Sequence, residues 1–215
     1  MRTVLITGGA GLLGKSLIKH FARLGDKVIA TDIKPFTSEF NNVRCVKMSV
    51  IEPKHIEEVF KSDRINVLIN NAGVNKTTYD NIMNVNCKGT YFCCREAIEQ
   101  GVKTIVNIAS IYGIVSPNPK VSNNPCTYGM SKAAIIQMTK YLATHHKGVR
   151  VNCVSPGGIY DNQDVNFVMG YNSQVPMKRM ATADEIAKVI VFLASDDASY
   201  INGENIIIDG GLTIW

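Results

Sequence analysis

Short apolar runs alternate along the chain with longer segments in which apolar side chains recur every three or four positions. The first run, Val4-Leu5-Ile6, is typical of a buried strand, and the stripe Leu13, Leu17 and Phe21 that follows it is typical of an amphipathic helix. The pattern predicts strands over 2–7, 27–32, 43–48, 65–70, 103–109, 149–154 and 205–209. It predicts helices over 12–24, 53–62, 78–100, 126–146 and 183–195.

Apolar strands separated by helices indicate a parallel sheet that is covered on both faces. We therefore expect an α/β fold, a doubly wound (Rossmann) three-layer sandwich with a parallel sheet of about seven strands. The sequence shows no repeat, low-complexity tract or linker, so one domain is expected over 1–215. Two irregular stretches, 113–125 and 157–182, follow predicted strand ends, where ligands bind in such sheets.

A glycine-rich turn lies between the first strand and the first helix. Gly9, Gly11 and Gly14 fit the spacing G-x-G-x-x-G, which lets backbone N–H groups and a helix N-terminus approach a pyrophosphate. Asp32 ends the second strand, where a carboxylate would bind ribose hydroxyls and repel a 2′-phosphate, which favours NAD over NADP. Glycine turns also close ordinary strand–helix junctions, and Asp32 could simply face water beside Lys34.

Composition excludes several other functions. The net charge of +5 includes no dense Lys/Arg stripe, so no nucleic-acid partner is expected. No apolar run reaches the roughly 20 residues of a membrane helix, and no signal peptide precedes the first strand, so we expect a cytoplasmic protein without a membrane partner. The 6 cysteines form no C-x-x-C pair and have no histidine cluster, which predicts reduced thiols and no metal site.

Tyr128 and Lys132 are four residues apart in a predicted helix, so their side chains share one face. A nearby cation stabilises a phenolate and lowers its pKa from about 10, which would let the phenol exchange protons near neutral pH. Further candidates lie at or beside the ends of later strands: Asn71, Asn86, Ser110 and Pro156-Gly157. Each also has an ordinary explanation as a helix cap, a helix bend, a turn hydroxyl or a plain turn.

Together, Asn70-Asn71-Ala72-Gly73, Ser110, Tyr128-x-x-x-Lys132, Pro156-Gly157 and the glycine turn resemble the short-chain dehydrogenase/reductase family, single-domain branch. The resemblance covers essentially the whole chain. It implies an NAD(P)-dependent oxidoreductase that interconverts a secondary alcohol and a ketone. It also implies a catalytic tetrad in which Tyr128 is the general acid/base, Ser110 binds the same substrate oxygen, Lys132 binds ribose and lowers the phenol pKa, and Asn86 holds a water that relays protons.

The same resemblance implies the cofactor contacts. Ser49 occupies a place where an acid often meets the adenine, and a serine can still form a hydrogen bond there. The implied cofactor-binding residues are Gly8, Gly9, Gly11, Leu12, Leu13, Gly14, Asp32, Ser49, Val50, Asn71, Ala72, Gly73, Tyr128, Lys132, Pro156, Gly157 and Ile159.

The chain departs from the family pattern in its turn, because the spacing Gly8, Gly11, Gly14 is similar to that of sugar-nucleotide epimerases and dehydratases. The stretches that would flank the substrate carry Asn118, Asn123, Asn124, Tyr160, Asp161, Asn162, Gln163 and Tyr171. These polar walls, and a similarity to bacterial oxidoreductases of surface-polysaccharide and flagellar-sugar synthesis, favour a sugar or activated sugar as substrate. The alternatives are an NAD-retaining epimerase or dehydratase and a non-catalytic dinucleotide sensor. The resemblance also implies a homodimer or homotetramer.

Overall fold

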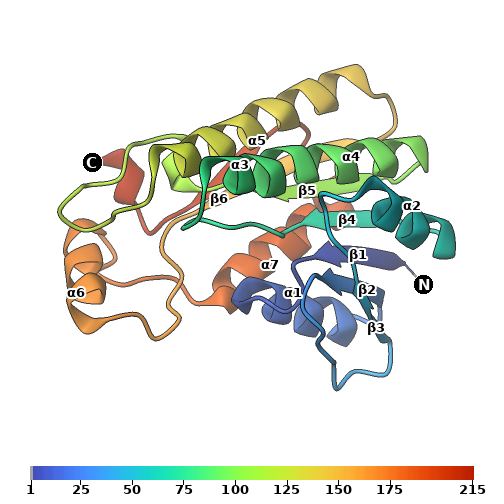
Figure 1. Ribbon diagram of the computed structural model, residues 1–215, viewed down its shortest axis with the longest axis horizontal. Coiled ribbons are helices and arrows are strands. Elements are labelled where there is room, and N and C mark those ends of the chain that lie inside the picture. The colour runs from blue at the N-terminus through green and yellow to red at the C-terminus, as the bar shows by residue number, and fades with distance from the viewer. Residues whose placement is uncertain (1) are drawn as a thin grey trace.

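The computed structural model describes residues 2–215, which form one parallel sheet of seven strands between two layers of helices (Figure 1). The strands are β1 (Thr3–Thr7), β2 (Lys27–Asp32), β3 (Val43–Lys47), β4 (Val67–Asn70), β5 (Thr104–Ile108), β6 (Arg150–Pro156) and β7 (Asn205–Ile208). Their order in the sheet is β3-β2-β1-β4-β5-β6-β7, and each neighbouring pair is parallel. The predicted doubly wound α/β fold is confirmed.

Two layers of helices cover the sheet. The longer helices are α1 (Leu12–Arg23), α2 (Pro53–Ser62), α4 (Thr90–Glu99), α5 (Cys126–His145), α6 (Val165–Gln174) and α7 (Ala183–Leu193). Helices α1 and α7 cover one face, and α2, α4 and α5 cover the other (Figure 1). Strand β1 serves both layers because its side chains alternate: Val4 and Ile6 join the core under α1 and α7, while Leu5 joins the opposite core.

The strand order reverses between β1 and β4, from which the chain winds towards the two opposite edges. Ligands of such sheets bind in the crevice outside the carboxyl ends of the strands at this reversal. Thr7, the last residue of β1, joins β1 to the segment after β4, because its Oγ1 accepts the N–H groups of Asn71 and Ala72, both at 3.0 Å. The glycine turn and the Asn-Asn-Ala-Gly segment therefore meet at the reversal.

Two predicted elements are wrong in detail. The helix expected over 78–100 is divided into α3 (Tyr79–Ile82), a π-helix (Met83–Gly89) and α4. The stretch 157–182, expected to be irregular, contains α6, whose first turn is capped by the side chain of Asp164. Tyr171 is the only buried residue of α6. A helix that buries so little needs no periodic apolar stripe, which is the pattern that marks the other helices in the sequence.

The helices and the cysteines of residues 2–215 also bear on what the sequence predicts. Among the helices of residues 2–215, none combines the length and apolar character that a membrane crossing needs. All six cysteines are free thiols, of which Cys93, Cys94 and Cys153 are buried. Cys126, at the start of α5, is exposed.

Candidate active site

The glycine turn is packed so closely that a side chain at Gly8 or Gly14 would meet backbone atoms. Gly8 has a φ of +71°, and a Cβ there would lie 2.8 Å from the Cα of Ala72. A Cβ on Gly14 would lie 2.2 Å from the backbone oxygen of Gly8. By contrast, a Cβ on Gly11 would meet only that same oxygen within 4 Å, at 3.4 Å. Gly8 and Gly14 therefore serve the packing of turn and helix, while Gly11 is free to face a ligand.

A groove of about 480 Å³ opens at this turn. Its wall contains these predicted cofactor residues: Gly8, Gly11, Leu12, Leu13, Asp32, Ser49, Val50, Asn71, Ala72 and Gly73. It also contains residues that the sequence analysis missed: Ala10, Ile33, Lys34, Met48, Ile51, Val74, Asn81 and Val85. Most of the missed residues adjoin predicted ones in the sequence. Asn81 and Val85 come from α3 and the π-helix, and no local motif marks them.

The remaining predicted cofactor residues are not in the wall of this groove: Gly9, Gly14, Tyr128, Lys132, Pro156, Gly157 and Ile159. Gly9 is turned inward, because a Cβ there would lie 2.8 Å from the ring of Phe36. Tyr128 and Lys132 lie on α5, and Pro156 ends β6. These residues therefore belong to a neighbouring part of the site at the carboxyl ends of the strands.

Asp32 is held in the groove by backbone groups. One carboxylate oxygen accepts the N–H of Ala10 at 3.1 Å, and the other accepts the N–H of Lys34 at 3.0 Å. The acid is therefore part of the turn as well as a possible ribose ligand. A carboxylate oxygen has more than one lone pair, so it can accept a ligand hydroxyl in addition to these donors.

The donor set of the groove fits a nucleotide diphosphate. Helix α1 begins at Leu12 after Gly11, which offers no side chain to cap it. The N–H groups of the first helical turn have no partner inside the helix, and the helix dipole favours an anion there. Together with the close-packed turn, this arrangement suits the pyrophosphate of a dinucleotide.

Tyr128, Ser110 and Lys132 converge at the carboxyl end of β5. Ser110 follows β5 and begins a 3-10 helix (Ile111–Gly113), where its Oγ accepts the N–H of Tyr112 at 3.2 Å. Lys132 is 5% exposed, and its Nζ donates to the backbone oxygen of Ile108 at 2.7 Å. The same Nζ lies 5.7 Å from the centre of the Tyr128 ring. The helical spacing thus places a phenol, a hydroxyl and an ammonium group together.

The electrostatics of this cluster differ from the expectation. Burial raises the pKa of the Tyr128 phenol and outweighs the opposing effect of its hydrogen bond with Ser110. Burial also lowers the pKa of Lys132 to about 8. The raised phenol pKa differs from the lowering expected from Lys132, because burial of the phenol outweighs the contacts that lower its pKa.

Asn86 lies in the π-helix and is fully buried. Its Oδ1 accepts the N–H of Val74 at 2.8 Å, and its Nδ2 donates to the Val74 oxygen at 2.8 Å and to Ser131 Oγ at 3.0 Å. The side chain therefore joins the segment after β4 to α5. A Cβ on Gly73 would lie 3.6 Å from Lys132 Nζ, so this connection brings the groove wall beside Lys132.

The residues expected to form polar substrate walls divide into three groups. Tyr160, Asp161, Asn162 and Asn123 are exposed at this end of the sheet. Asn118, Asn124 and Gln163 instead form hydrogen bonds within their own loops. Tyr171 is buried, so it belongs to the interior and not to a substrate wall.

Comparison with known proteins agrees with this geometry. The family profile described as Enoyl-(Acyl carrier protein) reductase matches residues 12–213. The 3-oxoacyl-(acyl-carrier-protein) reductase FabG of Thermotoga maritima is 35% identical, over 99% of this chain and 98% of the relative. The 7alpha-hydroxysteroid dehydrogenase of Bacteroides fragilis is 32% identical, over 99% of this chain and 95% of the relative.

Solved structures give the same result. A short chain dehydrogenase from Leptospira borgpetersenii with bound NAD+ has a TM-score of 0.92 at 33% identity, covering 99% of this chain and 93% of its own. The structure of ElxO with NADP bound has a TM-score of 0.87 at 29% identity, covering 98% of each chain. Both nicotinamide dinucleotides are therefore found among proteins of this shape.

The fold and the site define a Rossmann-type oxidoreductase that uses a nicotinamide dinucleotide. The chain belongs to the short-chain dehydrogenase/reductase family. It is an NAD(P)-dependent oxidoreductase that acts on CH–OH groups and the corresponding ketones.

Proposed function

We propose that the protein interconverts a secondary alcohol and a ketone, with Tyr128 as the general acid/base. The observation that carries this proposal is the convergence of Tyr128, Ser110 and Lys132 beside the dinucleotide groove. When bound, the nicotinamide supplies or accepts the hydride. Ser110 and the Tyr128 phenol bind one substrate oxygen, and the phenol donates a proton to it or removes one.

Lys132 serves this exchange by its charge and its position. Its pKa of about 8 leaves it mostly protonated at neutral pH, so a developing phenolate would be stabilised by a nearby cation. Asn86 holds the groove wall against α5 and thereby fixes the place of Lys132. We infer that Asn86 acts mainly through this connection, because both of its side-chain polar atoms are already engaged.

The proton-transfer role is tested by Tyr128→Phe, which removes only the hydroxyl. We expect turnover to fall by about 100-fold or more, as for loss of a general acid/base, while NADH binding persists. Tyr112→Phe is the matched control, because it removes a neighbouring phenol and keeps the backbone N–H that binds Ser110. Steady-state rates and NADH fluorescence titration measure both effects. Full activity of Tyr128→Phe would overturn the assignment.

The same measurements separate the alternatives. A sugar-nucleotide epimerase or dehydratase would retain its dinucleotide through purification and show no net release of NADH. A dinucleotide sensor would bind NADH without turning over any alcohol or ketone, and its Tyr128→Phe variant would behave as the wild type.

We further propose that NAD is preferred to NADP, because Asp32 adds a carboxylate to the wall of the groove, where it would bind ribose hydroxyls and repel a 2′-phosphate. Asp32→Asn removes the charge but keeps one oxygen that can accept a backbone N–H of the turn. We expect the variant to gain about tenfold in NADPH affinity, which corresponds to ~1.4 kcal/mol of relieved repulsion. Thermal shifts with NADH and NADPH measure the preference, since a ligand at ~100 Kd adds ~2.7 kcal/mol.

Lys34→Gln provides the opposite change in the same groove wall. Removing this cation should weaken NADPH binding more than NADH binding. If wild-type protein is stabilised equally by both dinucleotides and neither variant alters their ratio, Asp32 does not select the cofactor.

For the substrate, we propose a hydroxyl-rich small molecule, such as a sugar or activated sugar. The support is the set of exposed polar side chains Asn123, Tyr160, Asp161 and Asn162 near the strand ends. A screen should compare sugar phosphates and nucleotide sugars with acyl thioesters, steroids and small diols. Turnover of the last three classes alone would contradict the proposal.

A further inference from the structure

The turn after β6 is held by three main-chain hydrogen bonds to two other segments. Gly157 N–H donates to Ile208 O at 2.9 Å, Ala181 N–H to Gly158 O at 2.9 Å, and Tyr160 N–H to Ala181 O at 2.8 Å. These bonds join the turn to β7 and to the segment before α7. They leave the N–H of Gly158 to a different partner.

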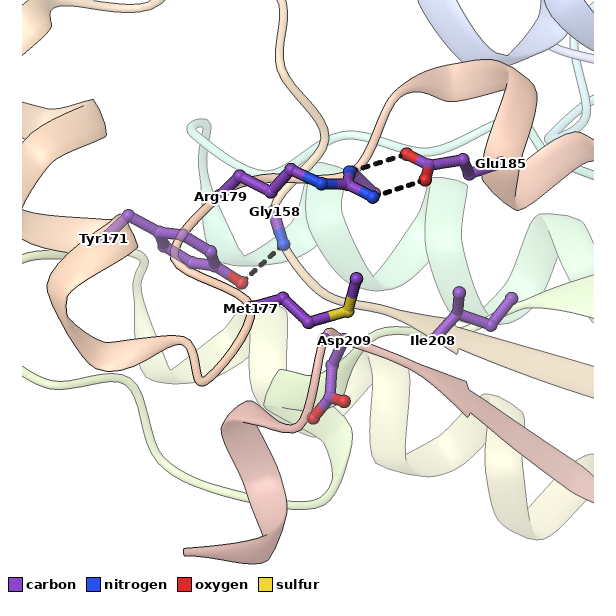
Figure 2. A pocket seen from close by; sticks show the side chains of 9 residues that line it. Gly158, Tyr171, Met177, Arg179, Glu185, Ile208 and Asp209 are labelled. Atoms are coloured by element: carbon purple, nitrogen blue, oxygen red, sulfur yellow. Dashed lines mark hydrogen bonds and ion pairs between the residues drawn. The ribbon is translucent and has the colours of Figure 1, made fainter.

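That partner is the side chain of Tyr171 in α6. The Tyr171 hydroxyl oxygen accepts the Gly158 N–H at 2.5 Å, as Figure 2 shows. A Cβ on Gly158 would lie 2.8 Å from Cζ of the ring, and a Cβ on Gly157 would lie 2.9 Å from its hydroxyl oxygen. Two adjacent glycines are thus required because the phenol lies directly against their backbone.

Tyr171 is itself held in place by apolar side chains. It is 4% exposed and forms a small apolar cluster with Val175 and Met180, which Phe167 and Val121 also contact. Burial raises the pKa of its phenol to about 12, so the hydroxyl stays neutral. Without the hydroxyl, the Gly158 N–H would lose this acceptor.

Ile159 is the residue that this arrangement places. It pairs with Ala181 in a parallel bridge, whose two hydrogen bonds run from Ala181 to Gly158 and Tyr160, so the N–H and C=O of Ile159 point away from Ala181. The Ile159 oxygen accepts Gln163 Nε2 at 2.7 Å. The Ile159 N–H is thereby directed away from the bridge and can be offered to a ligand.

We propose that Tyr171 is a positioning residue for the nicotinamide half of the dinucleotide. Its hydroxyl oxygen and ring fix the Gly157–Ile159 turn at the carboxyl end of β6. It does not line the groove at the glycine turn, which we assign to the adenosine half, so its effect should be confined to the other end of the cofactor. This inference rests on the proposed function, because it assumes that a nicotinamide dinucleotide occupies both places.

The test uses two ligands that differ only in the nicotinamide. Affinities for NADH and for ADP-ribose are measured by titration calorimetry with the wild type and with Tyr171→Phe, which keeps the ring and removes the acceptor. We expect NADH affinity to fall about fivefold, as for loss of one neutral hydrogen bond, and ADP-ribose affinity to stay unchanged. Tyr141→Phe, an exposed phenol on α5, is the control and should change neither.

A double-mutant cycle tests the ring contact. Gly158→Ala should weaken NADH binding, because its Cβ meets the Tyr171 ring, and Tyr171→Leu should partly restore binding in the double variant. Equal losses for NADH and ADP-ribose would mean a general structural role and overturn the proposal, as would unchanged NADH affinity in Tyr171→Phe. Failure of the wild type to bind either ligand would instead overturn the proposed function.

Discussion

Lys132 shows how one residue combines two opposing demands. Lys132 must stay positively charged to stabilise a phenolate. The fold, however, removes its ammonium group from water, which disfavours the charged form. Its single hydrogen bond to a described residue, to Ile108 O, only partly replaces hydration. The charged form is therefore stabilised less in the folded protein than in the unfolded chain, and the pKa falls from 10.5 to about 8.

This shift predicts a pH dependence of stability. Between pH 8 and 10.5 the unfolded chain binds more protons at this site than the native protein, so Lys132 makes the free energy of unfolding rise with pH in that window. We expect wild-type protein to gain up to about 3 kcal/mol relative to Lys132→Met from below the window to above it. Urea unfolding at pH 7.5 and pH 10 measures most of the change.

The difference between the two proteins isolates Lys132 from other titrating groups. Burial raises the pKa of the Cys93 and Cys94 thiols, so these groups make the free energy of unfolding fall as pH rises. This contribution is the same in wild type and Lys132→Met. Parallel pH profiles of wild type and Lys132→Met would show that the ammonium group is not desolvated.

At the scale of elements, the start of α7 controls the turn that we assign to the nicotinamide. Thr182 and Glu185 form a complete capping box, and Arg179 binds Glu185 through two hydrogen bonds of 2.8 and 2.6 Å (Figure 2). Ala181, between these residues, pairs with Ile159. The helix cap therefore anchors the segment against which the turn is built.

The cap has a pH-dependent part and a pH-independent part. The hydrogen bond from Arg179 is the main reason why the pKa of Glu185 falls to about 2, so its contribution is present above pH 4.5 and is lost as pH falls towards 2. Glu185→Gln should lower the Tm only slightly at pH 7, because exposed ion pairs contribute little to stability. The decrease in Tm should become smaller as the medium is acidified. Thr182→Ala should lower it by about 3 °C across this range.

Differential scanning calorimetry at pH 7 and pH 3.5 compares the two variants. An effect of Glu185→Gln that grows in acid would contradict the assigned role of the Arg179 pair. A Tm of Thr182→Ala equal to that of the wild type would mean that the cap does not contribute to stability.

The sequence predicts elements well where burial makes them periodic, and poorly elsewhere. Strands such as 27–32 are recognisable because both faces are covered, and Gly25 and Pro53 mark helix ends by their backbone requirements. Helix α6 escapes prediction because it buries only one of its residues. The π-helix carries Asn86, whose partners Val74 and Ser131 are distant in the sequence, so no local pattern marks it. The contact between Tyr171 and Gly158 is likewise invisible until α6 is folded against β6.

At the scale of the whole molecule, the two edges of the sheet differ in chemistry. The outer strand β3 carries the exposed charges of Arg44 and Lys47, which discourage pairing with another sheet. The opposite edge, β7, has the sequence Asn205-Ile206-Ile207-Ile208 and bears no charge. We propose that a second copy of the chain covers this edge in a homodimer or homotetramer.

Substitution at the uncharged edge tests this assembly. Ile207 is 43% exposed, and Ile207→Lys would place an ammonium group in an apolar contact between copies. We expect light scattering to give a multiple of the 23.6 kDa chain mass for the wild type and a smaller species for this variant. Leu24→Lys is the matched control, because Leu24 is 62% exposed at the end of α1, and its mass should equal that of the wild type. A monomeric wild type would contradict the proposed oligomer. An unchanged mass in Ile207→Lys would move the interface away from β7, towards the exposed tyrosines of α4 and α5.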